Sequence, residues 1–324
     1  MVRGRLAPSP TGALHLGNAR TFLLAWLSVR SQGGRMVLRI EDLDGPRVKP
    51  GAVSQLIDDL RWLGLDWDEG PDLGGPVSPY TQTERLEHYD RAFERLRDAG
   101  LVYPCDCSRS DIERAASAPH WGDEGPPYPG TCAERSWPEG ADSGTSDETR
   151  RPSWRFRVPA GETRFFDQIC GEQCWDVRRL SGDFVVRKGS GAAAYQLAVV
   201  VDDAAMGITE VVRGDDLLSS TPRQWLLYEA LGWQPPTFRH VPLVVGPDGR
   251  RLAKRHGDTR VSYFREAGIS PEKLVGLLAY WCGLRDFGQA VRPRELVAGF
   301  EWSRLSRERI VCDQESALAA LRRP

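Results

Sequence analysis

Two short segments, more than 200 residues apart in the chain, restrict its possible folds most strongly. The first, residues 5–18, contains Pro-Ser-Pro-Thr-Gly and then His15 and Gly17, directly before an apolar pattern of helical period. Free N–H groups and the dipole at the start of a helix attract phosphate, so His15 and Gly17 are candidates for phosphate contacts. The second segment, residues 251–255, follows a strand-like run and places Lys254 in a glycine-flanked loop, from which its ammonium can neutralise phosphate charge. We therefore expect a nucleotide site that the fold assembles from both segments.

The order of the expected elements indicates the architecture. Strands expected at 2–7 and 36–40 alternate with helices at 15–31, 50–63 and 81–99, and this alternation predicts an α/β fold with a doubly wound, Rossmann-like parallel sheet. Short strands follow at 154–158, 164–169 and 183–187, and the doubly wound pattern returns with an apolar run at 195–201, a strand at 208–213, a helix at 221–231 and a strand at 240–245. We divide the chain into a first Rossmann-like half (1–102), an insertion (103–190), a second Rossmann-like half (191–245) and a loop with a C-terminal helical region (246–324).

The charge balance narrows the class of partner. The formal net charge of −2 provides no general attraction to nucleic acid, so an RNA partner requires a local cluster of Lys and Arg. The apolar run at 22–27 is too short to span a bilayer, and Met1 leads into a strand-like segment without the apolar core of a signal peptide. We therefore expect a cytoplasmic protein with no membrane partner.

The spacing of the cysteines predicts a metal site in the insertion. Cys105 and Cys107 are separated by one residue, and Cys132 follows in a stretch rich in Pro and Gly. Three thiolates this close in the sequence favour one tetrahedral zinc ion, which would be structural because the phosphate segments lie elsewhere. The alternative is that these cysteines are unrelated and bind no metal. Cys170 and Cys174 form a second pair, which we expect to be core or surface thiols.

Taken together, the segments resemble the catalytic half of glutamyl-tRNA synthetases, which are class I aminoacyl-tRNA synthetases with signature sequences called HIGH and KMSKS. The resemblance covers residues 3–280 and depends on segments 5–17, 38–42, 195–198, 212–216 and 252–254. Asn18 replaces the last residue of HIGH, and Arg251 and Ala253 replace the first Lys and the Ser of KMSKS. The resemblance implies ATP with Mg²⁺ as a substrate, catalytic roles for His15, Gly17 and Lys254, and an ATP site made of Pro8, His15, Gly17, Asn18, Leu252 and Lys254.

The same resemblance implies that L-glutamate is bound by Arg5, Ala7, Ser9, Glu41, Tyr195 and Arg213. The charges of these residues suit the ligand, because Arg5 and Arg213 offer a fork for its side-chain carboxylate and Glu41 can pair with its ammonium. The excess of positive charge would reject neutral glutamine. The alternative for Glu41 and Arg213 is a buried ion pair that serves only the fold.

The insertion is similar to that of glutamyl-queuosine tRNA(Asp) synthetases, short relatives of the glutamyl enzymes in which a tyrosine completes the zinc site. Tyr128 stands where that pattern needs it, and His120 competes with it as the fourth ligand. The chain length agrees with this family, because the long glutamyl enzymes carry a further helical region that reads the anticodon. The resemblance thus implies a monomer that transfers glutamate to queuosine in the anticodon stem-loop of tRNA(Asp). Two alternatives remain: a truncated or separate-domain glutamate–tRNA(Glu) ligase, and a catalytically silent tRNA-binding paralogue.

Overall fold

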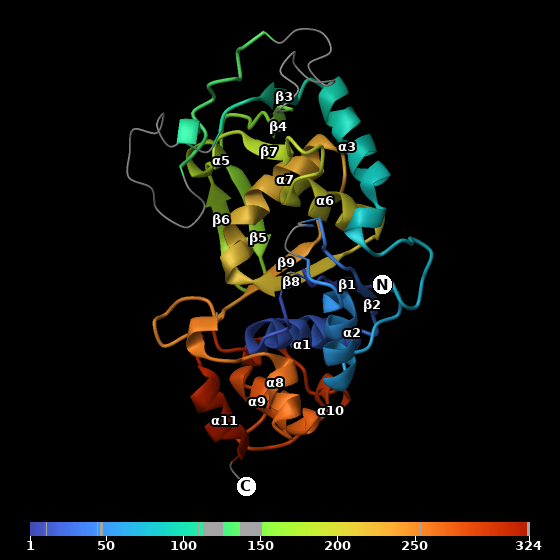
Figure 1. The fold of residues 1–324 in the computed structure, drawn as a ribbon, viewed down its shortest axis with the longest axis vertical. Coiled ribbons are helices and arrows are strands. Elements are labelled where there is room, and N and C mark those ends of the chain that lie inside the picture. Colours follow the sequence, from blue (N-terminus) through green and yellow to red (C-terminus); the bar gives the residue numbers. More distant parts are fainter. Residues whose placement is uncertain are drawn as a thin grey trace.

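The computed structural model describes residues 1–10, 12–43, 45, 48–108, 110–112, 126–136, 151–252 and 254–322, with only the backbone of Lys254. Figure 1 shows an elongated molecule whose central strands β1, β2, β8 and β9 lie between the insertion strands at one end and the C-terminal helices at the other. No helix among the described residues is both long enough and apolar enough to cross a membrane.

The central strands are parallel, as the sequence predicts. Strand β1 (Arg3–Leu6) pairs with β2 (Arg35–Leu38), and β8 (Glu210–Gly214) pairs with β9 (Thr237–Val241). The two pairs are joined where the Thr209 amide donates to the carbonyl of Arg3 at 2.8 Å. In this arrangement the carboxyl ends of β1 and β8, which carry Arg5 and Arg213, lie at the same edge of the sheet.

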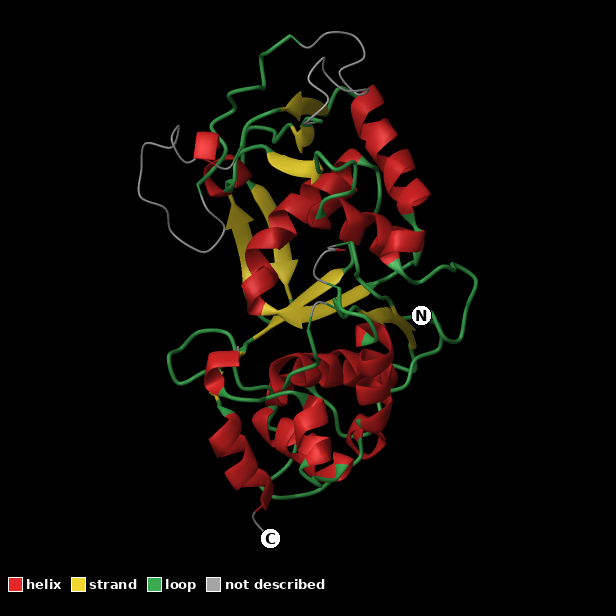
Figure 2. Ribbon diagram, viewed as in Figure 1, coloured by secondary structure: helices red, strands yellow, loops and turns green. Residues whose placement is uncertain are grey.

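Helices cover both faces of these strands, which confirms the doubly wound prediction (Figure 2). Met36 and Leu38 pack in one core with α1 (Leu16–Ser31) and α2 (Ala52–Trp62), whereas Val37 between them packs in the other core. The second core contains residues of α3 (Leu86–Asp98), α6 (Tyr195–Ala205) and α7 (Thr221–Ala230). A strand buried on both faces reads as an unbroken apolar run, which is why β2 is recognisable in the sequence.

The insertion builds a separate sheet and also extends the central one. Strands β3 (Val102–Cys105), β4 (Ser153–Phe156) and β7 (Phe184–Arg187) form an antiparallel sheet. The hairpin of β5 (Thr163–Asp167) and β6 (Gly171–Trp175) instead joins the edge of β9, with Asp167 beside Phe238, and the short helix α5 (Val177–Leu180) follows it. The sheet is therefore mixed, because β6 runs antiparallel to β5.

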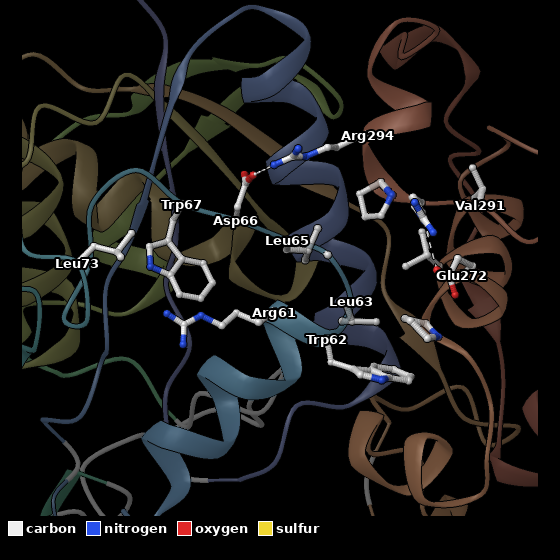
Figure 3. A pocket seen from close by; sticks show the side chains of 15 residues that line it. Arg61, Trp62, Leu63, Leu65, Asp66, Trp67, Leu73, Glu272, Val291 and Arg294 are labelled. Carbon is white, nitrogen blue, oxygen red and sulfur yellow. Dashed lines mark hydrogen bonds and ion pairs between the residues drawn. The ribbon is translucent and has the colours of Figure 1, made fainter.

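The C-terminal region is mostly helical, as expected, with α8 (Val261–Glu266), α9 (Pro271–Trp281), α10 (Pro293–Val297) and α11 (Gln314–Arg322). Two short strands, β10 (Val244–Val245) and β11 (Ile310–Val311), pair in parallel, which the sequence did not predict. Figure 3 shows a pocket where these helices meet the segment after α2. Arg294 reaches across it to Asp66, with 2.7 Å between Nη2 and Oδ2, and this ion pair ties α10 to the catalytic half.

The element boundaries differ from the prediction in four places. The helix expected at 50–63 begins at Ala52, because Gly51 adopts φ +75° at its N-cap. The helix expected at 81–99 is a 3₁₀ turn, η2 (Gln82–Glu84), followed by α3. The strand expected at 240–245 divides into the end of β9 and β10, and the apolar run at 195–201 is the first part of α6. Strand β6 was not predicted, since its residues lack an apolar alternation.

Candidate active site

The start of α1 holds His15 in one orientation and one protonation state. His15 is the N-cap residue, and its Nδ1 accepts a hydrogen bond from the Asn18 amide at 3.3 Å. Burial, assisted by the charge of Arg251, lowers the pKa of His15 to about 4. The imidazole is therefore neutral at pH 7 and carries its proton on Nε2, which makes it a hydrogen-bond donor for a phosphate oxygen.

Gly17 protects this arrangement. A Cβ atom at position 17 would lie 3.2 Å from the His15 ring and 3.6 Å from Cβ of Val244. The contact with the His15 ring is tighter than most real Cβ contacts, so a side chain here would shift the imidazole by a few tenths of an ångström, whereas the distance to Val244 is an ordinary van der Waals contact. The helix start thus needs glycine for packing as well as for access by a ligand.

The two nucleotide segments predicted from the sequence do meet in the fold. The Leu16 amide donates to the carbonyl of Thr259 at 3.0 Å, and the Val261 amide donates to the carbonyl of Leu14 at 2.8 Å. His15 and Leu252 line one cavity together with residues 257–260. The backbone of Lys254 begins the 3₁₀ turn η5 (Lys254–His256), while its side chain and Ala253 lie outside the described residues.

Acidic residues hold the loop that contains Lys254. Nη1 of Arg251 lies 2.8 Å from Oδ2 of Asp216, which lies in the first turn of a 3₁₀ segment, η4 (Asp215–Ser220). Asp248 accepts from Arg255 at 2.8 Å, and its other oxygen lies 3.0 Å from Nε2 of His256. Asp248 therefore links the start of the loop to Arg255 and His256, which directly follow Lys254.

Arg5 reaches from β1 to β8, and Arg213 reaches from β8 to α7, both at the carboxyl edge of the sheet. Nη1 of Arg5 donates to the carbonyl of Val212 at 3.2 Å. Nη2 of Arg213 donates to Thr221 and Gln224, both at 2.8 Å. Nη1 of Arg213 and Nε of Arg5 are buried and have no hydrogen-bond partner in the part of the chain that the structure describes. Buried cationic donors without a partner are an incomplete arrangement, and an anionic ligand would complete it.

A buried pair that sequence reasoning missed orients Arg213. His240 accepts from Nε of Arg213 at 2.9 Å, and its Nδ1 lies 2.7 Å from Oδ2 of Asp167, with both side chains fully buried. Burial lowers the pKa of His240 to about 4, so the ring is neutral, donates through Nδ1 and accepts through Nε2. Asp167 comes from the insertion hairpin, so only the strand order β5-β9-β8 brings the three residues together. The one sequence signal was that His240 stands at the start of the strand expected at 240–245.

Glu41 belongs to a larger charge cluster than the sequence indicated. Oε1 of Glu41 accepts from Arg39 at 2.9 Å, and Arg39 also donates to Asp203 at 2.7 Å. Burial raises the pKa of Glu41, against the attraction of Arg39 and Arg5. Nε of Arg5 lies 3.6 Å from Oδ1 of Asp203. The prediction of one carboxylate facing two arginines was therefore incomplete, because Arg39 and Asp203 join the same cluster.

The remaining predicted site residues border this cluster. The turn after β1 holds Ala7, Pro8 and Ser9, and the Pro8 carbonyl accepts from the Glu41 amide at 3.0 Å. Ser9 is exposed and Ala7 is partly buried. Tyr195 is the first residue of α6 and is 39% exposed, so its ring borders the site and remains accessible.

The cysteine cluster forms as predicted. Donor atoms of Cys105, Cys107 and Cys132 all lie within 4.8 Å of one another. The Tyr128 hydroxyl lies 3.5 Å from Sγ of Cys105 and accepts from the Cys132 amide at 2.8 Å. Arg155 donates to Sγ of Cys105 at 3.3 Å and stacks on the Tyr128 ring. Three thiols and a phenol at these separations suit a tetrahedral metal ion. Cys170 and Cys174 are exposed thiols, which confirms one of the two alternatives for that pair.

Comparison with known proteins identifies the class to which this fold and site belong. Residues 1–317 match the family model described as tRNA synthetases class I (E and Q), catalytic domain. The chain therefore belongs to the class I tRNA synthetases that handle glutamate and glutamine, which confirms the resemblance found in the sequence.

Individual relatives refine this placement. A glutamyl-Q tRNA(Asp) synthetase of Symbiobacterium thermophilum is 54% identical over 320 residues, which are 98% of each chain, and a protein of the same name from Rhodopirellula baltica is 52% identical over 328 residues. Glutamate–tRNA ligase 1 of Halorhodospira halophila is 48% identical over 94% of this chain but only 64% of its own. The crystal structure of a glutamate tRNA ligase from Elizabethkingia meningosepticum superposes with a TM-score of 0.83 at 30% identity, over 98% of this chain and 68% of that one.

Acid should destabilise the fold through His15 and His240. Both have a folded pKa of about 4, below the ordinary 6.5, so the unfolded chain binds these protons first. The free energy of unfolding should therefore fall as the pH drops from 6.5 toward 4, by up to roughly 1.4 kcal/mol per pH unit for each histidine. Urea unfolding between pH 6.5 and 5, where few carboxylates titrate, measures this slope.

His15→Asn is the matched control, since Asn keeps an N-cap acceptor but does not titrate. Its slope should be shallower than that of the wild type. An identical slope in the two proteins would show that His15 is not held neutral.

Proposed function

We propose that this protein activates L-glutamate with ATP and transfers it to queuosine at the wobble position of tRNA(Asp). The observation that carries the proposal is that Nε of Arg5 and Nη1 of Arg213 are buried at the sheet edge without a hydrogen bond from any described residue. The relatives that match this chain over nearly their whole length have the name of that activity.

Charge complementarity supports glutamate as the amino acid. Its side-chain carboxylate accepts on both oxygens and can satisfy Nη1 of Arg213 and Nε of Arg5 together. Glutamine would turn an NH₂ group toward one of these donors and leave that donor buried without an acceptor. The resulting loss of binding free energy disfavours glutamine and makes the site selective for glutamate. Glu41 and the partly exposed Tyr195 complete the site on the side of the ligand's ammonium, with Ala7 and Ser9 at its border.

The chemistry proceeds in two steps. The α-carboxylate of glutamate attacks the α-phosphorus of ATP, which forms glutamyl-adenylate and releases pyrophosphate. A hydroxyl of the queuosine cyclopentene ring then attacks the adenylate carbonyl, an ester forms and AMP leaves. Mg²⁺ bound to ATP neutralises phosphate charge. The enzyme contributes chiefly position and electrostatics, as in phosphoryl transfers generally.

We assign the ATP contacts to Pro8, His15, Gly17, Asn18, Leu252 and Lys254. His15 donates its Nε2 proton to a phosphate oxygen, which its neutral state and its hydrogen bond to Asn18 both support. Lys254 neutralises the charge that develops on the leaving pyrophosphate, and the closed loop around Asp248 would position its backbone. None of the cysteines serves as a nucleophile.

We also propose one structural zinc ion bound by Cys105, Cys107, Cys132 and Tyr128. The short separations within the cluster support all four ligands. His120, the competing fourth ligand, lies outside the described residues. We also propose that the zinc-containing insertion spans 103–190, between Rossmann-like halves at 1–102 and 191–245 and before the C-terminal region at 246–324. The protein is proposed to be a cytoplasmic monomer.

A second candidate is a glutamate–tRNA(Glu) ligase, which the 48% identity to the Halorhodospira ligase favours. The two candidates share the activation step and differ only in the acceptor, so the acceptor must decide between them.

Labelled glutamate should pass to tRNA(Asp) that contains queuosine, and neither to queuosine-free tRNA(Asp) nor to tRNA(Glu). Nuclease fragments should retain the label in the anticodon arm, and mild alkali should release it, because the bond is an ester. Label at the 3′ end of tRNA(Glu) would establish the ligase instead. A chain that forms no adenylate in a pyrophosphate-exchange assay would be the silent paralogue.

Removing the acceptor for Arg213 should weaken glutamate binding. His240→Phe keeps the ring that stacks on Phe238 but accepts no hydrogen bond, so we expect the KM for glutamate to rise about 10- to 100-fold, as for one unpaired buried charged donor. The KM for ATP should not change. His240→Gln, whose amide oxygen can accept from Nε of Arg213, should recover most of the loss.

This pair of variants separates positioning from general damage to the fold. If His240→Phe and His240→Gln raise the KM for glutamate equally, or raise the KM for ATP as well, His240 does not act through Arg213.

Metal analysis should find about one zinc per chain, and Cys107→Ala should lose it. Cys170→Ala, an exposed thiol outside the cluster, is the matched control and should keep full zinc content. Tyr128→Phe should bind zinc more weakly, whereas His120→Ala should not. Full zinc content in Cys107→Ala would remove the site, and loss in His120→Ala alone would reassign the fourth ligand.

A further inference from the structure

A second concave site lies in the insertion half of the molecule, away from the nucleotide segments. Four basic side chains line it, Arg97, Arg151, Arg187 and Lys188, together with Glu94, Pro152, Trp154, Gly189 and Gly191. We call this site the basic pocket. The lysine is informative, because only 4 of the 43 basic residues in this chain are lysines.

Three segments distant in the sequence build the basic pocket. Arg97 lies near the end of α3, Arg151 directly precedes β4, and Lys188 follows β7. A Cβ atom at position 189 would lie 2.6 Å from the carbonyl oxygen of Arg151, so only glycine lets the turn after β7 approach this closely. The turn closes where the Gly191 amide donates to the Lys188 carbonyl at 2.8 Å. The close approach holds Lys188 and Arg151 side by side.

The pocket carries unneutralised positive charge. Arg97 forms an ion pair with Glu94, and Nη2 of Arg187 lies 2.9 Å from Oδ1 of Asp90. Arg151 and Lys188 form no ion pair with any described residue. Arg187 is further held by Phe93, whose ring centre lies 4.7 Å from the guanidinium carbon. Two cations held by ion pairs and two without an ion pair to the described residues line one pocket, and together they form a site for an anion with several negative groups.

The position of the pocket links it to the candidate active site. The turn after β7 leads directly into α6, whose first residue is Tyr195. Between them, the Ala194 amide donates to the Val186 carbonyl at 2.8 Å, and Arg187 bridges to Ala193. Figure 1 shows β7, α6 and α3 together on the same side of the central sheet. A ligand held by Lys188 is therefore connected to the glutamate site through a short, hydrogen-bonded segment.

We propose that the basic pocket binds backbone phosphates of the RNA acceptor, with Arg151 and Lys188 as the principal contacts. This inference rests on the proposed function, since it assigns to the RNA substrate a surface outside the catalytic site. A chain with a net charge of −2 needs a local cluster of cations for RNA, and consecutive phosphates match cations spaced along a groove. The contacts carry no base information, so the pocket sets the position of the RNA, while recognition of the modified base remains with the active site.

The test uses the full chain with charge reversals at Arg151, which is exposed, and Lys188, which is partly buried. Arg151→Glu/Lys188→Glu should bind tRNA(Asp) at least about tenfold more weakly than wild type in 0.1 M salt. The slope of log K against log[salt] should become shallower by about 1.5 to 2, the scale for two lost phosphate contacts. Both queuosine-containing and queuosine-free tRNA(Asp) should show the loss, because the contacts are to phosphate.

Lys273→Glu is the matched control. It makes the same charge change as Lys188→Glu alone, on α9 at the opposite end of the molecule, where Lys273 is exposed. It should bind RNA with the wild-type salt slope. Pyrophosphate exchange without RNA should be unchanged in every variant, which separates RNA binding from glutamate activation.

Wild-type affinity and slope in Arg151→Glu/Lys188→Glu would overturn the proposal, as would an equal loss in Lys273→Glu. The acceptor assay is independent of this outcome. The wild-type protein could transfer no glutamate to queuosine while RNA binding is lost in Arg151→Glu/Lys188→Glu and kept in Lys273→Glu. That result would show that the proposed acceptor is wrong and that the basic pocket nevertheless binds RNA.

Discussion

A buried network of arginines and carboxylates at the carboxyl edge of the central sheet is the constraint on which the rest of the structure depends. Arg39 donates to Glu41 and Asp203, and Arg85 donates to Asp202 at 2.7 Å with both side chains fully buried. Removing one member of such a pair costs about 3–5 kcal/mol, because its partner stays buried and charged. The network therefore forms only when α6 packs against β2 and the segment before α3, and this packing defines the space that the ligand enters.

Within this network, a few donors remain unused, and these define the site. Arg39 and Arg85 pair with carboxylates of the protein, yet each also keeps a buried nitrogen without a hydrogen bond from the described residues, as do Arg5 and Arg213 at the proposed ligand site. His240 explains how Arg213 remains in place when the ligand is absent, since a neutral ring accepts from one guanidinium nitrogen without neutralising its charge. Fold stability and the proposed ligand recognition thus share one charge cluster, since Glu41 accepts from Arg39 and is also the proposed partner of the ligand's ammonium.

The sequence predicted the helices and strands of the catalytic half well, for a physical reason. Strands buried on both faces are continuous apolar runs, and helices show apolar residues at helical spacing. The residues of β2 and α1 are therefore enough to recognise these two elements. The segments at His15 and Lys254 were identified for a similar reason, because strand–turn–helix geometry and glycine-flanked loops are local. Strand β6 and the pair of β10 and β11 were missed, since their stability comes from neighbours far along the chain.

The sequence by itself determined the family, the nucleotide segments, the arginines proposed to bind glutamate and the cysteine cluster, because each is recognised from residue types within short segments. Only the tertiary structure decided which charges are available to a ligand. His240 contacts Arg213, Asp167 contacts His240 and Asp203 contacts Arg39, through the strand order of the sheet and the packing of α6. The sequence separations of these pairs are 27, 73 and 164 residues. The basic pocket has the same origin, since Arg97, Arg151 and Lys188 meet only where α3, β4 and β7 converge. Burial and charge pairing are properties of the assembled chain, and no local pattern encodes them.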